Sequence, residues 1–545
     1  MNQLASALGD TLLRRLPPAA TSDPALLLQA SRALIAALEQ GELGLDLEGP
    51  PPEGVEASSW PEATLQALAA SGWMAEADQL AANSSAEASS ASHAVIMRDG
   101  RWLRWRRWHE QRLLCLDDLI QRAQASLQPA PTAQAIAAAT ASAAAAGLDP
   151  QQQAAVAALL KHQLVLLLGG PGTGKTSTVA QMLQAALALD PQLRVQLAAP
   201  TGKAAARLSA ALDAVHPLPC STLHRLLEAR GNGRFARNAK QPLELDLLVV
   251  DELSMVDLPL MRALLEAMPA QARLLLVGDA GQLPPVGTGA VLEELSRAEL
   301  RERLGAAVVE LTTTYRNNGA IAALASALRQ APERTSDPLP ALRPLLSQLT
   351  SEDNLRWLEC PLQQLPPEVL QPLREHQQRL RQLSLALRWQ GGEVEPSGSA
   401  ALLSELEQLM ALSPLRQGPW GVAALHRALL GPAATGPLER WPLGTPVLNR
   451  RNHPEQNLAN GEIGVLVERN GQRLVLMAGD RLLHPARLAG AEPALALTVH
   501  KAQGSQYRQV LLLVPPSRHG DPRLLYTGLT RARQAVLLVT PAQAA

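Results

Sequence analysis

The chain has 545 residues, 47% of them hydrophobic, which is enough for three or four domains of ordinary size with full cores. Its net charge of −1 does not mark a nucleic-acid-binding protein, but residues 1–92 carry −9 and the remainder therefore +8. No apolar run reaches the roughly 18 residues that span a bilayer, and the N-terminus lacks a signal-like core, so we expect no membrane contact and a cytoplasmic protein. Cys115, Cys220 and Cys360 form no CxxC pair, which excludes a zinc ribbon or a four-cysteine iron–sulfur cluster within the chain.

Residues 1–130 predict a mainly helical N-terminal domain that docks to a partner. Within it, "AVIMRDGRWLRW" predicts a hairpin that turns at Asp99-Gly100, and "RRWHEQRLLCLDDLIQRAQASL" predicts a helix. For the "RWLRWRRW" stretch we favour a structural or docking role over binding of single strands, because its Trp and Arg side chains fall on different faces.

Residues 131–307 alternate strands of the buried type with helical stretches, which is typical of a parallel sheet with helices on both faces. The strands are expected at 164–169, 194–200, 247–252 and 273–279. A second set of strands, at 308–312, 509–514 and 536–540, predicts a second α/β domain over 308–545. The turn-rich segment near 444–492 predicts a small β-barrel inserted in that domain, whereas residues 331–410 indicate only helix.

A complete phosphate-binding loop, G-x-x-x-x-G-K-[ST], lies between a predicted strand and a predicted helix. We expect its residues and the next serine to bind the phosphates of ATP: Gly169, Gly170, Pro171, Gly172, Thr173, Gly174, Lys175, Thr176 and Ser177. Lys175 is expected on the β- and γ-phosphates, and the Thr176 hydroxyl on Mg²⁺. The chain has only five lysines, and three of them lie in "GTGKTS", "PTGKAAARL" and "TVHKAQGS".

The ends of the next strands supply the remaining groups for hydrolysis. In "LLVVDELSM", Asp251 would hold Mg²⁺ through water and Glu252 would polarise the attacking water. In "LVGDAGQLPPVG", Gln282 would sense the γ-phosphate. Arg316 in "LTTTYRN" and Arg531 in "YTGLTRAR" would neutralise transition-state charge if the second domain packs over the nucleotide.

In this order the motifs resemble those of superfamily 1 helicases, over roughly residues 148–545 with an interruption at 331–410. "STLHRLL", "LSPLRQGPWGV", "NRRNHPEQNLANGEIGV" and "RWLRWRRWHEQRLL" resemble more closely the alpha subunits of exodeoxyribonuclease V, the RecD family. The resemblance implies two tandem RecA-like motor domains with an SH3-like insertion. It also implies an ATP-dependent 5′-to-3′ DNA helicase that works with RecB and RecC on single-stranded and duplex-end DNA, in double-strand-break repair and recombination.

The resemblance further implies roles for single residues. Gln152 would contact adenine. Thr201 and His224 would lie near the single strand in the first motor domain, and Thr498, His500 and Lys501 near it in the second. The segment near 228–243 would form a small hairpin beside the duplex junction. Two departures, "HKAQGSQY" and His426 in place of an amide, bear on DNA contacts and not on the phosphate chemistry.

Four alternatives remain to be weighed. A nuclease core of a common type needs a carboxylate two positions before a lysine, but the residues there are Leu159, Thr173, Thr201, Asn238 and Val499. A ring ATPase takes its arginine from a neighbouring subunit, whereas both candidate arginines lie in this chain. An inactive subunit disagrees with the intact motifs. A free-standing helicase of the same superfamily is the main competing interpretation.

Overall fold

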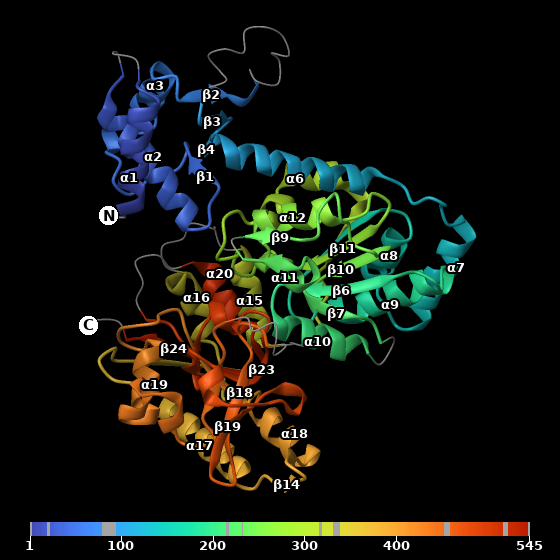
Figure 1. Cartoon of the computed structure of the whole chain (residues 1–545), viewed down its shortest axis with the longest axis vertical. Helices are drawn as coiled ribbons and strands as arrows, with labels where there is room; N and C mark the ends of the chain where they lie inside the picture. Colours follow the sequence, from blue (N-terminus) through green and yellow to red (C-terminus); the bar gives the residue numbers. More distant parts are fainter. Residues whose placement is uncertain are drawn as a thin grey trace.

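The computed structural model describes residues 3–18, 22–78, 94–213, 217–231, 233–315, 319–330, 338–451, 458–515 and 521–542. Figure 1 shows three parts, which we call the head (residues up to 105), the first lobe (106–311) and the second lobe (319–542). Across these described ranges, no helix combines the length and the apolar character that crossing a membrane demands.

The head combines three helices with a four-stranded sheet. The helices are α1 (Gln3–Arg15), α2 (Pro24–Glu39) and α3 (Glu62–Ala70), and the strands run in the order β1 (Gly44–Asp46), β4 (Trp102–Trp105), β3 (Ile96–Asp99) and β2 (Met74–Glu76). The predicted hairpin is confirmed, since β3 and β4 pair antiparallel with Asp99 opposite Trp102. Gly100 supplies the left-handed turn with φ 56°. The other two strands were not predicted.

The "RWLRWRRW" stretch builds the junction between the head and the first lobe. The Trp102 ring lies 5.1 Å from the guanidinium of Arg104 and 5.0 Å from that of Arg297, which belongs to the first lobe. Arg112 of the first lobe pairs with Asp99 of the head at 3.6 Å and with Glu294 of its own lobe at 2.7 Å. Cation–π contacts and the Arg112–Asp99 ion pair therefore join the head to this lobe.

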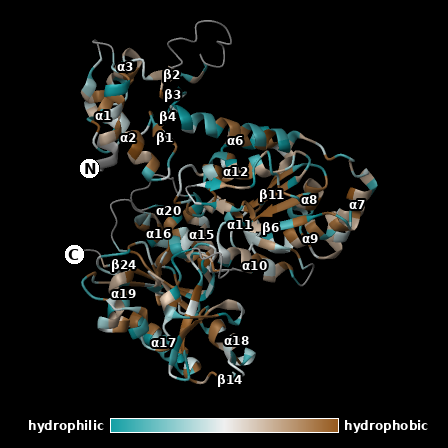
Figure 2. Ribbon diagram, in the orientation of Figure 1, coloured by the Kyte–Doolittle hydropathy of each residue, from teal (hydrophilic) through white to brown (hydrophobic). Residues whose placement is uncertain are grey.

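The first lobe is built on a six-stranded parallel sheet. Its strands run in the order β12 (Val308–Leu311), β5 (Leu164–Gly169), β11 (Arg273–Gly278), β10 (Leu247–Val250), β6 (Val195–Ala199) and β7 (Cys220–Thr222). β5 and β10 are buried along their whole length, because helices cover both faces of the sheet. Figure 2 shows the corresponding hydrophobic colour along β6 and β11.

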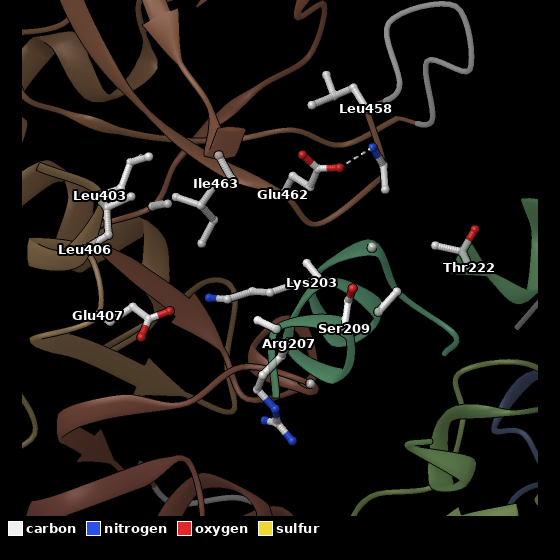
Figure 3. Close-up of a pocket in the computed structure, with 18 of the residues that line it drawn as sticks. Lys203, Arg207, Ser209, Thr222, Leu403, Leu406, Glu407, Leu458, Glu462 and Ile463 are labelled. Carbon is white, nitrogen blue, oxygen red and sulfur yellow. Dashed lines mark hydrogen bonds between the residues drawn. The ribbon is translucent and has the colours of Figure 1, made fainter. Parts of the chain in front are cut away.

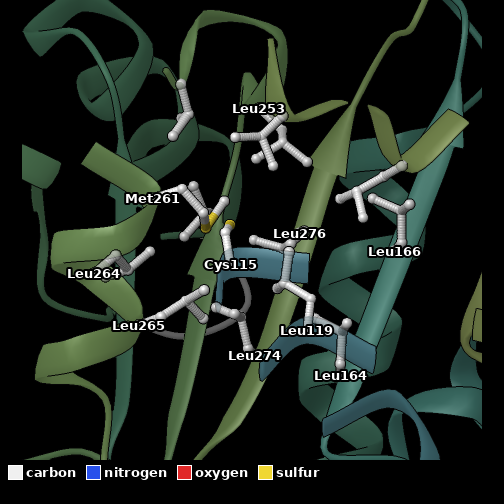
Figure 4. Close-up of a cluster of buried hydrophobic side chains, with 14 of the residues drawn as sticks. Cys115, Leu119, Leu164, Leu166, Leu253, Met261, Leu264, Leu265, Leu274 and Leu276 are labelled. Carbon is white, nitrogen blue, oxygen red and sulfur yellow. The ribbon is translucent and has the colours of Figure 1, made fainter. Parts of the chain in front are cut away.

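Two layers of helices enclose this sheet. One face carries α7 (Ala133–Ala145), α8 (Pro150–Leu159), α9 (Lys175–Leu189) and α10 (Gly202–Leu212). The other face carries α6 (Arg106–Gln124), α12 (Leu258–Ala267), α13 (Val291–Ser296) and α14 (Ala298–Leu304). In Figure 4, Cys115 and Leu119 of α6 lie among side chains of the strands and of α12.

Two of our expectations for the domain limits need correction. We expected strand 308–312 to open the second sheet, but β12 pairs parallel with β5 at the edge of the first sheet. We also expected residues 106–124 within an N-terminal domain ending at 130, but α6 contributes Leu119 and Ile120 to the core of the first lobe. Hydrophobic period gives the type of an element and not the partner against which it packs.

The second lobe contains a five-stranded parallel sheet in the order β13 (Leu355–Cys360), β24 (Ala532–Pro541), β23 (Tyr507–Leu513), β16 (Leu409–Ser413) and β22 (Ala496–Thr498). One face is covered by α15 (Ala320–Gln330), α16 (Leu339–Leu346) and α20 (Pro522–Leu529). The other is covered by α17 (Pro367–Leu385) and α19 (Val422–Leu430). Strands β13, β16 and β22 were not predicted.

A small antiparallel sheet is inserted between β16 and β22. Its strands run in the order β20 (Leu482–Leu483), β19 (Gln472–Leu476), β18 (Ile463–Arg469), β17 (Pro446–Leu448) and β21 (Glu492–Pro493). It packs against α17 and α18 (Pro396–Glu405) through a shared apolar core. The predicted fold class, two tandem parallel-sheet domains with a small β-barrel in the second, is confirmed.

Candidate nucleotide site and interdomain cavity

The phosphate-binding loop joins β5 to α9 at the carboxyl edge of the first sheet. Gly172 and Gly174 adopt φ angles of 77° and 79°, in the left-handed region that favours glycine. A Cβ on Gly174 would lie 2.5 Å from Nε2 of Gln152, and the Thr173 hydroxyl donates a 2.8 Å hydrogen bond to the carbonyl of Gly170. The loop is thus closed tightly around positions that only glycine can fill.

Lys175 is folded back onto this loop. Its Nζ donates hydrogen bonds to the carbonyl oxygens of Gly169 at 2.6 Å and of Gly170 at 2.9 Å. Burial lowers the pKa of Lys175, while the charges of Asp279 and Asp251 act in the opposite direction. The ammonium group is therefore surrounded by oxygen acceptors at the start of α9.

Two carboxylates follow β10. The backbone N–H of Glu252 donates a 2.8 Å hydrogen bond to Oδ1 of Asp251. Burial raises the pKa of Asp251, and the neighbouring charge of Glu252 raises it further. Glu252 itself has φ 54°, a strained conformation for a residue with a side chain. Its carboxylate accepts a 3.4 Å hydrogen bond from Nη2 of Arg207.

Asp279 follows β11 and contacts both lobes. Its Oδ2 accepts a hydrogen bond from Nε2 of Gln282 at 3.2 Å and another from the Tyr526 hydroxyl of α20 at 2.9 Å. Burial, and then the charge of Asp279, raises the pKa of Tyr526 well above its usual value. Leu283, the residue after Gln282, donates its N–H to the Thr527 hydroxyl at 2.9 Å. The loop after β11 is therefore the main polar link between the lobes at this site.

Arg531 lies at the nucleotide pocket, which is also lined by Lys175, Thr176 and Glu252. The side chain is 2% exposed and donates hydrogen bonds to the carbonyl oxygens of Thr527 and Ser505. Burial lowers its pKa, and the charge of Glu252 opposes this effect. The structure thus brings a cation of the second lobe to the phosphate-binding loop. Arg316, the other predicted arginine, lies outside the described residues.

The remaining predicted nucleotide contact, Gln152, lies beside the loop. Its Nε2 donates to the carbonyl of Thr173 at 3.4 Å, and its Oε1 accepts from the N–H of Asp149 in a capping box. Tyr315 donates a 2.6 Å hydrogen bond to Asp149 and so covers the same end of α8. Gln152 is held in place by the loop and by the start of its own helix.

The pocket has features that fit a nucleotide with Mg²⁺. Among the described residues that line it, two have a buried polar atom without a hydrogen-bond partner, namely Nη1 of Arg207 and Oε1 of Gln282. Buried polar groups are normally paired, so these atoms suit the oxygen atoms and water molecules that a nucleotide brings. The hydroxyl of Thr176 and the carboxylate of Asp251 are hard oxygen donors of the kind that Mg²⁺ prefers.

The pocket is small in this arrangement of the lobes. It encloses 40 Å³, whereas pockets for small molecules have roughly 300–1,000 Å³. Lys175 of the first lobe and Arg531 of the second line this narrow space from its two sides.

Three residues of this site were missed in the sequence. Arg207 lies in the recognised "PTGKAAARL" segment, and Tyr526 is one of only three tyrosines in the chain, so both carried a signal. Arg329 of α15 carried none. Its Nη1 would lie 3.3 Å from a Cβ placed on Gly170, which puts it at the mouth of the phosphate-binding loop.

A larger cavity of about 1140 Å³ lies between α10 of the first lobe and the barrel and α18 of the second. Figure 3 shows Lys203 and Arg207 extending from α10, with Glu462 and Ile463 of the barrel across the space. Charged side chains of both signs lie among apolar residues on the walls of this cavity.

The predicted strand contacts divide between this cavity and its surroundings. His224 lines it, and its ring lies 5.9 Å from that of Phe235. Thr201 caps α10 by accepting a hydrogen bond from the N–H of Ala204 at 3.2 Å, directly before the lining residues of that helix. The predicted hairpin is present as β8 (Ala229–Arg230) and β9 (Arg234–Phe235).

Thr498, His500 and Lys501 are not among the described residues that line the cavity. The Thr498 hydroxyl accepts a hydrogen bond from the N–H of Lys501 at 3.3 Å, and the His500 side chain is exposed. Lys501 pairs with Glu492, which also pairs with Arg416 at 2.8 Å and Arg450 at 3.0 Å. Three cations therefore surround one carboxylate beside the cavity.

His426 is a structural residue. It is 7% exposed, and its Nε2 accepts a 3.2 Å hydrogen bond from the N–H of Ala496 on β22. Burial lowers its pKa to about 4, so the ring is neutral at neutral pH. Its replacement of an amide therefore affects packing of the second sheet.

Comparison with known proteins adds evidence from outside the chain. Residues 152–288 match a family model described as an AAA domain, and residues 493–539 match one described as a UvrD-like helicase C-terminal domain. The RecBCD enzyme subunit RecD of Mycolicibacterium smegmatis is 39% identical over 463 residues, which cover 80% of this chain and 77% of that protein. The RecD subunit of Haemophilus influenzae is 30% identical and covers 70% and 67%.

Two further matches are more distant or more partial. The ATP-dependent RecD2 DNA helicase of Deinococcus radiodurans is 33% identical over 71% of this chain but only 48% of that protein. A solved structure of two coordinating Pif1 helicases at forked duplex DNA is 19% identical, with a TM-score of 0.42 over 73% of this chain and 93% of the other. A structural likeness at this level carries no argument about function.

Proposed function

The chain belongs to the RecD family, and from that premise we propose that it is an ATP-dependent 5′-to-3′ DNA helicase. We place it as the motor subunit of an assembly with RecB and RecC, acting on DNA ends in double-strand-break repair and recombination. The observation that supports this most is the convergence of side chains from two lobes, Lys175 and Glu252 from one and Arg531 from the other, on a single pocket.

For hydrolysis, we assign each group by its place in that pocket. Lys175 and the loop amides hold the β- and γ-phosphates, and Glu252 accepts the proton of the attacking water. Gln282 orients the γ-phosphate, while Arg531 neutralises charge that develops in the transition state. Arg316, which lies outside the described residues, is assigned the same role from its motif alone. Thr176 and Asp251 would hold Mg²⁺, which supplies charge neutralisation between the phosphates when bound.

Movement follows from the contacts that cross the lobes. Tyr526 and Arg531 reach the first lobe only where the lobes are close, and the pocket is too small for ATP in this arrangement. Binding and hydrolysis therefore alternate between two separations of the lobes. A strand held between His224 on one wall and the second lobe on the other is displaced at each change.

For DNA, we propose that the strand runs through the cavity beside α10 and past the cluster of Lys501, Arg416 and Arg450. We assign Thr201, His224, Thr498 and His500 to contacts with this strand. The cations of the cluster are only partly neutralised by Glu492, which leaves positive charge for phosphates. We assign the hairpin of β8 and β9 to contact with the duplex.

We assign no nuclease site to this chain and expect any cleavage to come from a partner. The head, with −9 over residues 1–92, is unsuited to phosphates and is assigned to partner contact. A free-standing helicase is the second candidate, since the relative in Deinococcus radiodurans is named as an ATP-dependent RecD2 DNA helicase and not as a subunit. Size-exclusion chromatography of the protein from its native lysate separates the two: co-elution with two larger proteins supports the assembly, and a lone 58.0 kDa helicase supports the alternative.

Strand displacement tests the helicase assignment. Substrates with a 5′ or a 3′ overhang are compared with and without ATP, and a Lys175→Gln variant serves as the control. We expect displacement from the 5′ overhang, dependent on ATP and abolished in the variant. Displacement from the 3′ overhang alone would refute the polarity, and undiminished activity of the variant would refute the site.

A further inference from the structure

Arg207 occupies the wall between the nucleotide pocket and the interdomain cavity. It belongs to α10 and lines both spaces. The first residues of the same helix, Gly202 and Lys203, line only the cavity, and Lys203 lies 4.9 Å above the ring of Tyr507 from the second lobe. Arg207 is thus shared by the site of hydrolysis and the proposed path of the strand, as is Gln506 of the second lobe.

On the pocket side, Arg207 holds the Glu252 carboxylate. Its Nη2 lies 3.4 Å from Oε1 of Glu252, and the Glu252 side chain is only 9% exposed. A carboxylate oxygen that accepts a hydrogen bond from a guanidinium is engaged, and the carboxylate is held in one orientation. Glu252 is therefore held against Arg207 and is not free to turn toward a water molecule at the phosphates.

The contact leaves Arg207 only partly satisfied. Its Nη1 is buried and has no hydrogen-bond partner among the described residues, and the single pairing at 3.4 Å is long for an ion pair. A planar guanidinium binds a phosphate through two parallel hydrogen bonds, which one long contact to Glu252 does not match. A phosphate in the cavity would therefore compete effectively for this side chain.

We propose that Arg207 is a positioning residue that makes ATP hydrolysis depend on an occupied cavity. With the cavity empty, Arg207 pairs with Glu252 and restrains the base. A strand phosphate in the cavity draws the guanidinium away, and the freed carboxylate accepts the proton of the attacking water. This inference rests on the proposed function, because it takes Glu252 as the base and the cavity as the strand path.

Steady-state ATP hydrolysis with and without a poly(dT) strand tests the proposal. In Arg207→Ala we expect the strand-free kcat to rise roughly fivefold and the stimulation by the strand to fall by a similar factor, with KM for ATP nearly unchanged. Arg207→Lys keeps the positive charge but loses the planar guanidinium with its two parallel N–H donors. Its stimulation by the strand should therefore lie between those of wild type and Arg207→Ala.

The matched control is Arg194→Ala. Arg194 forms a 2.7 Å ion pair with Asp246. Arg194 directly precedes β6 and Asp246 directly precedes β10, whereas Glu252 follows the other end of β10. In Arg194→Ala, the rates of ATP hydrolysis with and without the strand should both be unchanged. An unchanged strand-free rate in Arg207→Ala would overturn the proposal, and so would a fall of both rates in parallel, which marks a direct contact with the phosphates.

The same hydrolysis measurements on wild type and Lys175→Gln test the proposed function independently of Arg207. Wild-type hydrolysis that a strand stimulates and that Lys175→Gln abolishes upholds the motor assignment, whatever Arg207→Ala does. Absence of hydrolysis in wild type, or its persistence in Lys175→Gln, would overturn the proposed function itself.

Discussion

The hydroxyl of Tyr526 in the second lobe donates a 2.9 Å hydrogen bond to the carboxylate of Asp279 in the first. The bond is buried and lies beside the phosphate-binding loop, since a Cβ on Gly170 would be 3.3 Å from the same hydroxyl. Any change in the separation of the lobes must break or form it. It is therefore a direct physical connection between the nucleotide site and domain movement.

Tyr526→Phe should weaken this connection. A hydrogen bond to a charged group contributes about 1.5 kcal/mol or more, and this one holds the lobes in the arrangement whose pocket is too small for ATP. We therefore expect ATP to bind roughly tenfold more tightly in the variant, with a smaller change in kcat for hydrolysis. Steady-state kinetics and equilibrium binding measure the two quantities. Tyr507→Phe is the matched control, because the buried Tyr507 hydroxyl has no hydrogen-bond partner in the described part of the chain. Equal ATP affinities of the two variants would show that the cross-lobe bond has no role.

Glu492→Gln should tighten binding of single-stranded DNA. Burial alone would raise the pKa of Glu492, but Lys501, Arg450 and Arg416 lower it, so the residue is a carboxylate that neutralises part of the cluster. Its removal frees about one cation for a phosphate and should steepen the dependence of log K on log salt by about 0.7.

Fluorescence anisotropy over a series of salt concentrations measures this slope. Glu468→Gln controls for the loss of a charge alone, since Glu468 is an exposed residue of the same barrel. Weaker binding by Glu492→Gln, or the same gain in the Glu468 variant, would argue against the cluster as a phosphate contact.

His426 should make stability fall in mild acid. Its pKa in the folded protein is about 4, against about 6.5 in the unfolded chain, so between these values only the unfolded state takes up the proton. Stability is therefore full above pH 6.5 and is lost as the pH falls. Between pH 7.5 and 5.5 the free energy of unfolding should drop by about 1.4 kcal/mol from this residue.

Urea unfolding of wild type and His426→Gln at the two pH values isolates this contribution, because other histidines affect both proteins alike. We expect the drop to be smaller in the variant by about 1.4 kcal/mol. An identical drop in both proteins would mean that His426 is not the group that titrates.

The sequence was most informative where the residues of one short segment determine the structure of that segment by themselves. The phosphate-binding loop is a local motif, and β5, β10 and β11 were found within two residues because buried parallel strands are continuous apolar runs. The hairpin of β3 and β4 was predicted for the same reason, since Asp99-Gly100 specifies its turn.

What remained hidden depends on contacts between distant segments. β12 has the pattern of any short buried strand, and nothing local says that it pairs with β5. Arg329 is one arginine among many, and only the folded second lobe brings it to the loop. Arg207 was within a quoted motif, but its pairing with Glu252 depends on how α10 lies beside β10.

The central claim is that two lobes of one chain act on the same triphosphate, and Arg531 tests it most directly. Single-turnover hydrolysis and ATP affinity are measured for Arg531→Lys and Arg531→Ala, with circular dichroism to confirm folding. We predict that hydrolysis slows roughly 10³-fold in Arg531→Ala while ATP affinity changes far less, because the contact belongs to the transition state. Losses of equal size in hydrolysis and in affinity, or no loss in either, would contradict the account.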